Sequence, residues 1–98
     1  MIIVSGKIYV RSGLRDEFLV SSYEAIVKAR KASGCRDFIV AADPLESDRV
    51  NVYEEWDSEK QLLEFRGSGP DESLSSLIKS AAISRHKIAS SGLPSQKP

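Results

Sequence analysis

The chain has 98 residues, of which 41% are hydrophobic and 29% charged, a composition that allows one small domain with a packed core and argues against general disorder. Lys plus Arg and Asp plus Glu both number 14, so no basic excess is available to neutralise the phosphates of a nucleic acid. The single cysteine, Cys35, can form no disulfide within the chain and fits a reducing compartment. No apolar run has the length of a signal peptide or a membrane span. We therefore expect a cytoplasmic protein with neither nucleic acid nor membrane as its partner.

The first third of the chain predicts a strand followed by a helix. Residues 2–10 alternate apolar and polar positions, as in a half-buried strand. Ser12 is the candidate N-cap of a helix that runs to about Ala32, and Gly34 fits its C′ position. The apolar stripe of this helix contains Leu14, Phe18, Ser22, Ala25 or Ile26, and Ala29, widened by Val20, Tyr23 and Val27.

The middle third predicts an antiparallel hairpin. Residues 36–42 and 49–56 both fit strands, and Asp43-Pro44 begins the turn between them. In the second strand Val50, Val52, Glu54 and Trp56 point to one face, and Asn51, Tyr53 and Glu55 point to the other. Glu54 and Glu55 therefore cannot act as a carboxylate pair.

The last third predicts two short helices and a strand. Ser58 and Gln61 fit a capping box at the start of a helix over residues 58–66. Gly67-Ser68-Gly69 ends that helix, and Pro70 suits the first turn of another. Its predicted stripe consists of Leu74, Leu77, Ile78 and Ala81. A last strand over residues 82–89 closes a domain of residues 1–89, and residues 90–98 are expected to form a mobile tail.

The element order β-α-β-β-α-α-β predicts an α+β fold, the ferredoxin-like split βαβ arrangement with an antiparallel sheet. Helices cover only one face of such a sheet. The other face is expected to carry Ile3, Tyr9, Ile39, Ala41 and Tyr53. A second copy of the chain is the simplest cover for this apolar surface, so we expect a homodimer.

Two segments carry a resemblance to a known family. Residues 53–59, Tyr-Glu-Glu-Trp-Asp-Ser-Glu, with Leu62 downstream, resemble the Y-E-x-W-x-S/D-E signature of the antibiotic biosynthesis monooxygenase family. Residues 34–40, followed by Asp43-Pro44, are similar to that family's G-x-x-x-F-x-V…D-P segment. The resemblance extends from about Ile2 to Ile88. The family usually has a His at the end of the helix after the Trp, where this chain has Phe65 and then Arg66.

The resemblance implies a dimeric α+β barrel and a monooxygenase that needs no cofactor. Its substrate would be a small electron-rich aromatic molecule, such as a phenol, a hydroquinone or an anthrone, which reduces dioxygen once it is deprotonated. The protein would supply an apolar pocket, a base and groups that hold an oxyanion. The predicted substrate-binding residues are Tyr23, Phe38, Trp56, Phe65 and Arg85.

The catalytic candidates are Asn51, Trp56 and His86, each with a structural alternative. Trp56 could stack on an aromatic ligand, or it could be a core residue. Asn51 could hydrogen-bond a substrate oxygen, but its strand parity is opposite to that of Trp56, which favours the surface or an interface. His86, the only histidine, has the pKa range of a general base but no partner visible in the sequence.

The remaining polar candidates have weaker signals. Arg66 and Arg85 could hold an anionic oxygen, and the alternative is an ion-paired or solvated arginine. Cys35 fits a small buried residue better than a reactive thiol. No Cys/His cluster has the spacing of a metal site, so we expect no metal.

The sequence leaves four functions open. The monooxygenase comes first, followed by a non-catalytic binding or dimerisation module, which the replacement of the usual His by Phe65 favours. A small-molecule isomerase comes next. A haem-degrading oxygenase comes last, because neither Phe65 nor Arg66 can ligate iron as imidazole does.

Overall fold

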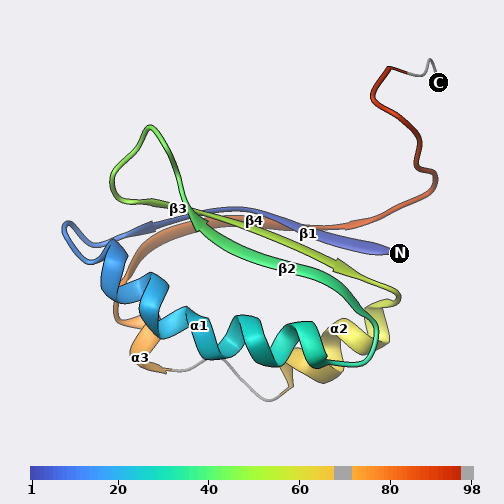
Figure 1. Cartoon of the computed structure of the whole chain (residues 1–98), viewed down its shortest axis with the longest axis horizontal. Coiled ribbons are helices and arrows are strands. Elements are labelled where there is room, and N and C mark those ends of the chain that lie inside the picture. Colours follow the sequence, from blue (N-terminus) through green and yellow to red (C-terminus); the bar gives the residue numbers. More distant parts are fainter. Residues whose placement is uncertain (68–71, 96–98) are drawn as a thin grey trace.

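A single antiparallel sheet forms one layer of the protein, and the helices form the other (Figure 1). The computed structural model describes residues 1–67 and 72–95, and this part contains four strands and three helices. In chain order they are β1 (Ile2–Val10), α1 (Arg15–Lys31), β2 (Cys35–Ala42), β3 (Arg49–Trp56), α2 (Glu59–Arg66), α3 (Glu72–Ser75) and β4 (Ile78–Lys87). The strand order is β2-β3-β1-β4, and all neighbours are antiparallel, which confirms the ferredoxin-like arrangement.

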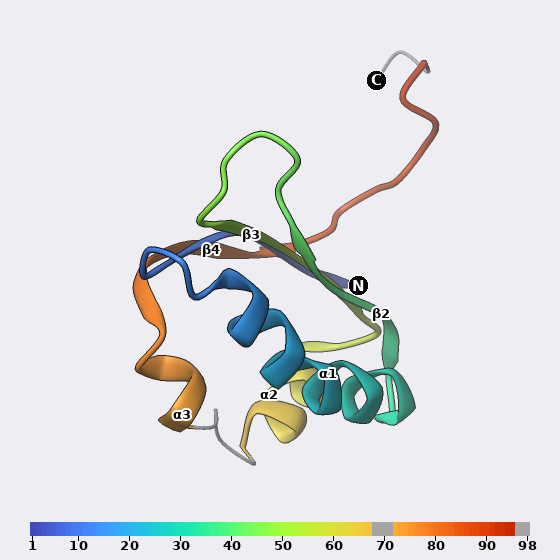
Figure 2. The same ribbon diagram turned by 60° about the vertical axis from the view of Figure 1, so that its left-hand side comes forward.

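The sheet has one face toward the helices and one away from them, and both views of the ribbon agree on this (Figures 1 and 2). Strand register aligns Ile2 with Trp56 and Val4 with Glu54, so the even-numbered residues of β1 and β3 share the helix-covered face. Most of these residues are buried, in two clusters. One cluster packs against α2 and contains Trp56 and Leu62, and the other lies near α3 and contains Val10 and Val50.

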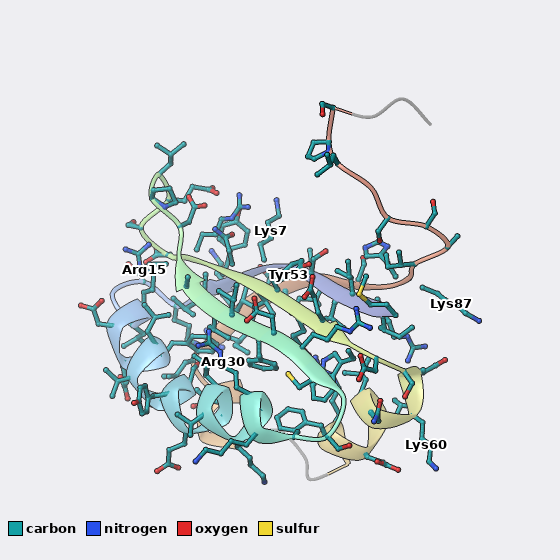
Figure 3. All side chains as sticks on the ribbon, turned by 45° about the vertical axis from the view of Figure 1, so that its right-hand side comes forward. Lys7, Arg15, Arg30, Tyr53, Lys60 and Lys87 are labelled. Carbon is teal, nitrogen blue, oxygen red and sulfur yellow. The ribbon has the colours of Figure 1, made fainter. Side chains whose placement is uncertain are left out.

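The face away from the helices carries polar as well as apolar side chains. The register places Ile39, Tyr53 and Ser5 side by side across β2, β3 and β1, as expected for the outer face. Figure 3 shows Lys7 and Tyr53 on this side of the sheet. Lys7 lies opposite Asn51, so charged and amide groups interrupt the apolar surface. Within the described residues, no helix is long and apolar enough to cross a membrane.

The start and the exposed side of α1 differ from the prediction. Leu14 takes the N-cap position and makes no side-chain cap, so Ser12 as N-cap was wrong. Ala32 is the C-cap, which places Gly34 one residue beyond the predicted C′ position, with a φ of 83° that glycine tolerates. Val20 and Tyr23 do not widen the buried stripe, since they are 76% and 67% exposed. At about 100° per residue, both lie on the side of the helix opposite the Phe18 face.

The predicted boundary between the last helix and the last strand was wrong. α3 ends at Ser75, and Ile78 and Ala81 belong to β4, where they pair with Val10 and Ile8 of β1. The helix-like spacing arises because a short turn, in which Leu77 N–H donates to the Leu74 carbonyl at 3.1 Å, leads directly into the strand. β4 therefore begins four residues earlier than predicted and ends at Lys87. The predicted start at Pro70 lies outside the described residues.

The cap of α2 is confirmed at Ser58. Its hydroxyl oxygen accepts a hydrogen bond from the backbone N–H of Gln61 at 3.3 Å. The Gln61 side chain accepts from the Ser58 hydroxyl at 3.0 Å and donates to the Ser33 hydroxyl at 3.3 Å. The cap thus also connects α2 to the segment that follows α1.

Gly6 lets β4 approach β1 closely, and this approach generates a stability prediction. A Cβ at Gly6 would lie 2.1 Å from the Ala82 carbonyl oxygen and 2.7 Å from the Ile83 Cα, both backbone atoms that cannot move alone. We expect Gly6→Ala to lower the free energy of unfolding by about 1–3 kcal/mol, measured by urea denaturation.

Gly13→Ala is the matched control. Gly13 also has a positive φ of 78°, but a Cβ there would meet nothing within 4 Å. The control therefore measures what a Cβ costs at a residue with positive φ when no neighbouring atom clashes with it. If Gly6→Ala costs no more than Gly13→Ala, the close approach of β4 is not what requires glycine.

Candidate functional site

A cavity of about 490 Å³ lies between the helix-covered face of the sheet and the helices. Ligand pockets of proteins usually have volumes of roughly 300–1,000 Å³. Strands β1 to β4 and helices α1, α2 and α3 all contribute to its wall. The apolar lining residues are Ile8, Phe18, Ala25, Phe38, Val40, Val52, Phe65, Leu74, Ile78 and Ile83. The space is therefore suited to a small, largely apolar molecule.

Phe65 joins the cavity to the core beneath it. Its ring centre lies 5.9 Å from that of Phe38, in an edge-to-face arrangement, and 5.3 Å from that of Trp56. Phe38 and Phe65 line the cavity, whereas Trp56 is fully buried and is not among the described lining residues. Two of the five predicted substrate-binding residues therefore meet at this cavity.

A buried carboxylate, that of Glu54, forms the polar centre of the site. Its side chain is 2% exposed and lines the cavity. Trp56 Nε1 donates to its Oε1 at 3.0 Å, and Arg66 Nη2 donates to its Oε2 at 2.5 Å. Buried charges need such partners, because an unpaired carboxylate in the interior is costly. Strand β3 supplies the carboxylate and the indole, and the last turn of α2 supplies the guanidinium.

Glu54 is not among the candidates predicted from the sequence, although the sequence contains a signal for its role. Glu54 shares its strand face with Val50, Val52 and Trp56, which is the buried face. A charged residue at an inward position predicts a buried partner, and Arg66 follows twelve residues later. The two adjacent carboxylates do point to opposite faces, as predicted, and Glu55 accepts a hydrogen bond from the Tyr53 hydroxyl at 2.6 Å on the other side. That hydrogen bond to Glu55 raises the pKa of Tyr53.

The structure places Tyr23 and Arg85 away from the described cavity lining. Tyr23 lies on the exposed side of α1. Arg85, on β4, forms an ion pair with Glu59 at 3.0 Å, and both side chains are about half exposed. Arg66 is also ion-paired, but unlike Arg85 it lines the cavity. Ligand binding by Tyr23 and Arg85 stays a prediction.

Asn51 and His86 lie on the face of the sheet away from the cavity. Register places Asn51 beside Lys7 and His86 beside Ile3. The Asn51 amide donates to Asp43 Oδ1 at 2.9 Å, and this bond, with two backbone N–H donors at the turn, lowers the pKa of Asp43 to about 2. Asn51 thus supports the β2–β3 turn, and its separation from Trp56 agrees with the predicted strand parity.

Cys35 is a half-buried free cysteine at the start of β2. Its sulfur lies 3.5 Å from the Asp37 carbonyl oxygen, to which the thiol donates. Burial raises the pKa of this thiol, which disfavours the reactive thiolate. Within the described residues, no group of His, Cys, Asp and Glu side chains could hold a metal ion.

Comparison with known proteins identifies a family. The profile of the antibiotic biosynthesis monooxygenase family matches residues 1–70. No curated protein matches the chain.

Several solved structures share the fold. A candidate antibiotic biosynthesis monooxygenase from Deinococcus radiodurans is 15% identical, with a TM-score of 0.83 over 95% of this chain and 97% of that one. A conserved protein from Methanosarcina mazei is 24% identical, with a TM-score of 0.77 over 88% and 90%. A Mycobacterium tuberculosis protein is 17% identical, with a TM-score of 0.79 over 94% and 98%.

Trp56 is expected to contribute strongly to stability. Trp56→Phe removes the N–H that Glu54 Oε1 accepts and leaves a void in a fully buried position. We expect the free energy of unfolding to fall by about 2 kcal/mol or more, measured by urea or thermal denaturation.

Tyr23→Phe is the control, because it also replaces an aromatic residue by Phe but at a position that is 67% exposed. This change should cost less than about 0.5 kcal/mol. Equal stability of Trp56→Phe and the wild type would show that the Trp56–Glu54 hydrogen bond contributes nothing to the fold.

Proposed function

Because the chain belongs to the antibiotic biosynthesis monooxygenase family, we propose that it oxygenates a small electron-rich aromatic compound, a phenol, hydroquinone or anthrone, without a bound cofactor. The observation that carries the proposal is the apolar cavity of about 490 Å³ between the sheet and the helices, with one buried carboxylate in its wall. The membership supports a monooxygenase-like activity, and the cavity supports the choice of substrate class. A cytoplasmic location stays a prediction.

In the proposed reaction the substrate supplies the electrons. An anthrone, once deprotonated, reduces dioxygen; its CH₂ group loses two hydrogens and gains one oxygen atom as a ketone. The second oxygen atom leaves as water with the two hydrogens. The chain's contribution is to hold the flat ring between Phe38 and Phe65 on one side and α1 on the other, away from bulk water.

Trp56 contributes to this site indirectly. It does not line the described cavity, but its ring packs on Phe65 and its N–H holds Glu54. We therefore assign to Trp56 the role of positioning the Phe65 ring and the carboxylate.

A non-catalytic binding module is the second candidate, and Phe65 is the observation that favours it. Phe65 stands where the resembled family usually has a His, and its ring packs against Trp56 and Phe38. An aromatic ring can bind a flat ligand but cannot transfer a proton. A small-molecule isomerase ranks behind it. Haem degradation ranks last, because the only histidine, His86, lies on the opposite face of the sheet.

We also propose that two copies pair through the face of the sheet away from the helices. Ile39 on this face is 37% exposed in the single chain and lies beside Tyr53. A sheet face with such exposed apolar side chains is a common dimer interface. Pairing across it would leave the cavity, which opens on the other face, accessible in both copies.

Oxygen consumption tests the proposed activity. Purified protein should accelerate oxygen uptake in the presence of dithranol, a dihydroxyanthrone, with one O₂ consumed per anthraquinone formed. Ala25→Phe places a ring into the cavity from α1 and should reduce the rate about tenfold or more. Val20→Ala, on the exposed side of the same helix, should leave the rate unchanged.

The two candidate functions give different results in this assay. Binding of the anthrone without any oxygen uptake above the buffer rate would favour the binding module. Equal rates for Ala25→Phe and the wild type would place the reaction outside the cavity.

Sedimentation velocity at micromolar concentration tests the assembly. The wild type should sediment as one species of twice the monomer mass, and Ile39→Glu should shift it toward the monomer, because two copies would bury unpaired carboxylates. Leu45→Glu, at a loop position that is 92% exposed, is the control and should stay dimeric. A wild-type monomer under these conditions would contradict the proposed pairing.

A further inference from the structure

The side of α1 that faces away from the sheet carries an apolar stripe. Val20 and Tyr23 are 76% and 67% exposed, and Val27, one turn further along, is half-buried. At about 100° per residue, these three side chains lie within an arc of roughly 60° around the helix axis. Single exposed apolar residues are common on protein surfaces, but a row of them along one helix face marks a contact surface.

Opposite charges lie at the two ends of this stripe. Asp16 is in the first turn of α1 and Lys31 is its last residue, and both are exposed. Their positions around the helix fall within about 40° of Val27, so both charges lie on the side of the stripe. Neither forms an ion pair within the part of the chain that the structure describes. The surface is therefore acidic at its start, apolar in its middle and basic at its end.

This order of side chains is complementary to itself when two α1 helices run in opposite directions. A two-fold axis that passes between residues 23 and 24 places Val20 opposite the partner's Val27, and Asp16 opposite the partner's Lys31. Tyr23 then lies next to its own copy, about 1.5 Å apart along the axis. A parallel pair would instead bring like charges together, so the charges favour the antiparallel arrangement.

We infer that the outer side of α1 is a contact surface for a second copy of this chain, paired antiparallel across a two-fold axis. One helix pair is much smaller than a standard protein–protein interface, so this contact is weak and forms at high micromolar concentration. The inference does not depend on the proposed activity. In both ribbon views α1 lies on the opposite side of the sheet from the face proposed to pair, so this contact would join one such dimer to the next (Figures 1 and 2).

Disulfide cross-linking tests the register of the two helices. Single cysteines are introduced in a Cys35→Ser background, and the proteins are oxidised with copper phenanthroline at about 0.5 mM. Tyr23→Cys should form a covalent dimer by itself, about tenfold faster than Lys60→Cys, an exposed position on α2 that reports random collisions.

Val20→Cys and Val27→Cys should cross-link only when they are mixed. In the inferred pair each of these cysteines lies about 10 Å along the axis from its own copy but directly opposite the other one. Cross-linking of either variant alone at the rate of the mixture would contradict the register, and no cross-link above the Lys60→Cys rate at any of the three positions would overturn the inference.

Charge reversal tests the orientation by a different measurement. Asp16→Lys places like charges at both ends of the pair and should weaken the association about threefold to tenfold, measured by sedimentation equilibrium. Adding Lys31→Glu restores opposite charges and should restore the affinity. A general effect of net charge or a damaged helix start would not be rescued in this way. Glu64→Lys, the same change of charge at an exposed position of α2, is the control and should leave the association unchanged.

The Ile39→Glu variant separates this contact from the proposed pairing through the sheet. With that pairing removed, Ile39→Glu should still increase in mass from monomer toward dimer between about 10 μM and 1 mM, and Asp16→Lys should suppress this increase. A wild type that stays dimeric over the whole range would overturn the inference and leave the sheet pairing intact. A wild type that stays monomeric would overturn both.

Discussion

The buried hydrogen bonds of Glu54 connect the parts of this protein on which the site depends. Its carboxylate binds the indole N–H of Trp56 on the same strand and the guanidinium of Arg66 on α2. The first bond fixes the ring that supports Phe65, and the second fixes the last turn of α2 against the sheet. A buried carboxylate that lost either partner would be strongly destabilised, so the pairing restricts how α2 can sit on β3. The position of one wall of the cavity follows from this restriction.

The cavity itself results from incomplete cover of the sheet. α1 packs along β2, and α2 covers the end of β3, while β4 lies at the far edge. Ile83 of β4 points to the helix-covered face yet is 41% exposed, because no helix of the described residues packs directly over it. A four-stranded sheet with one long and two short helices leaves such a space on its covered face. The same space in an isolated chain would be costly unless a ligand or solvent fills it.

The family of this protein follows from its whole fold, whereas its reaction depends on a few side chains. The profile match and the solved structures agree with the fold that the element order predicts. The reaction depends on a few side chains, and one of them departs from the resembled pattern at Phe65. In the structure the Phe65 ring packs against the ring of Phe38, which also lines the cavity, and against the buried ring of Trp56. The fold therefore supports the family, and the reaction stays a proposal that depends on the side chains of the cavity.

The amino-acid sequence by itself determined the elements whose signals are local. Period-two alternation defined β1 and β3, the Ser58 cap defined the start of α2, and strand parity separated Asn51 from Trp56. The family signature around Trp56 then indicated the fold class. Each of these signals depends on neighbours within a few residues, where backbone geometry alone fixes the side-chain directions.

Only the tertiary structure decided the features that depend on contacts distant in the sequence. Pairing with β1 converted Ile78 and Ala81 from a predicted helix stripe into a strand, because an interstrand ladder outweighs a short helical pattern. Packing on the sheet chose which side of α1 is buried and left Val20 and Tyr23 exposed. The partners of Glu54 became visible only when α2 folded back over β3. A charge on an inward face predicts that a partner exists, but which residue reaches it is set by the arrangement of the elements in space.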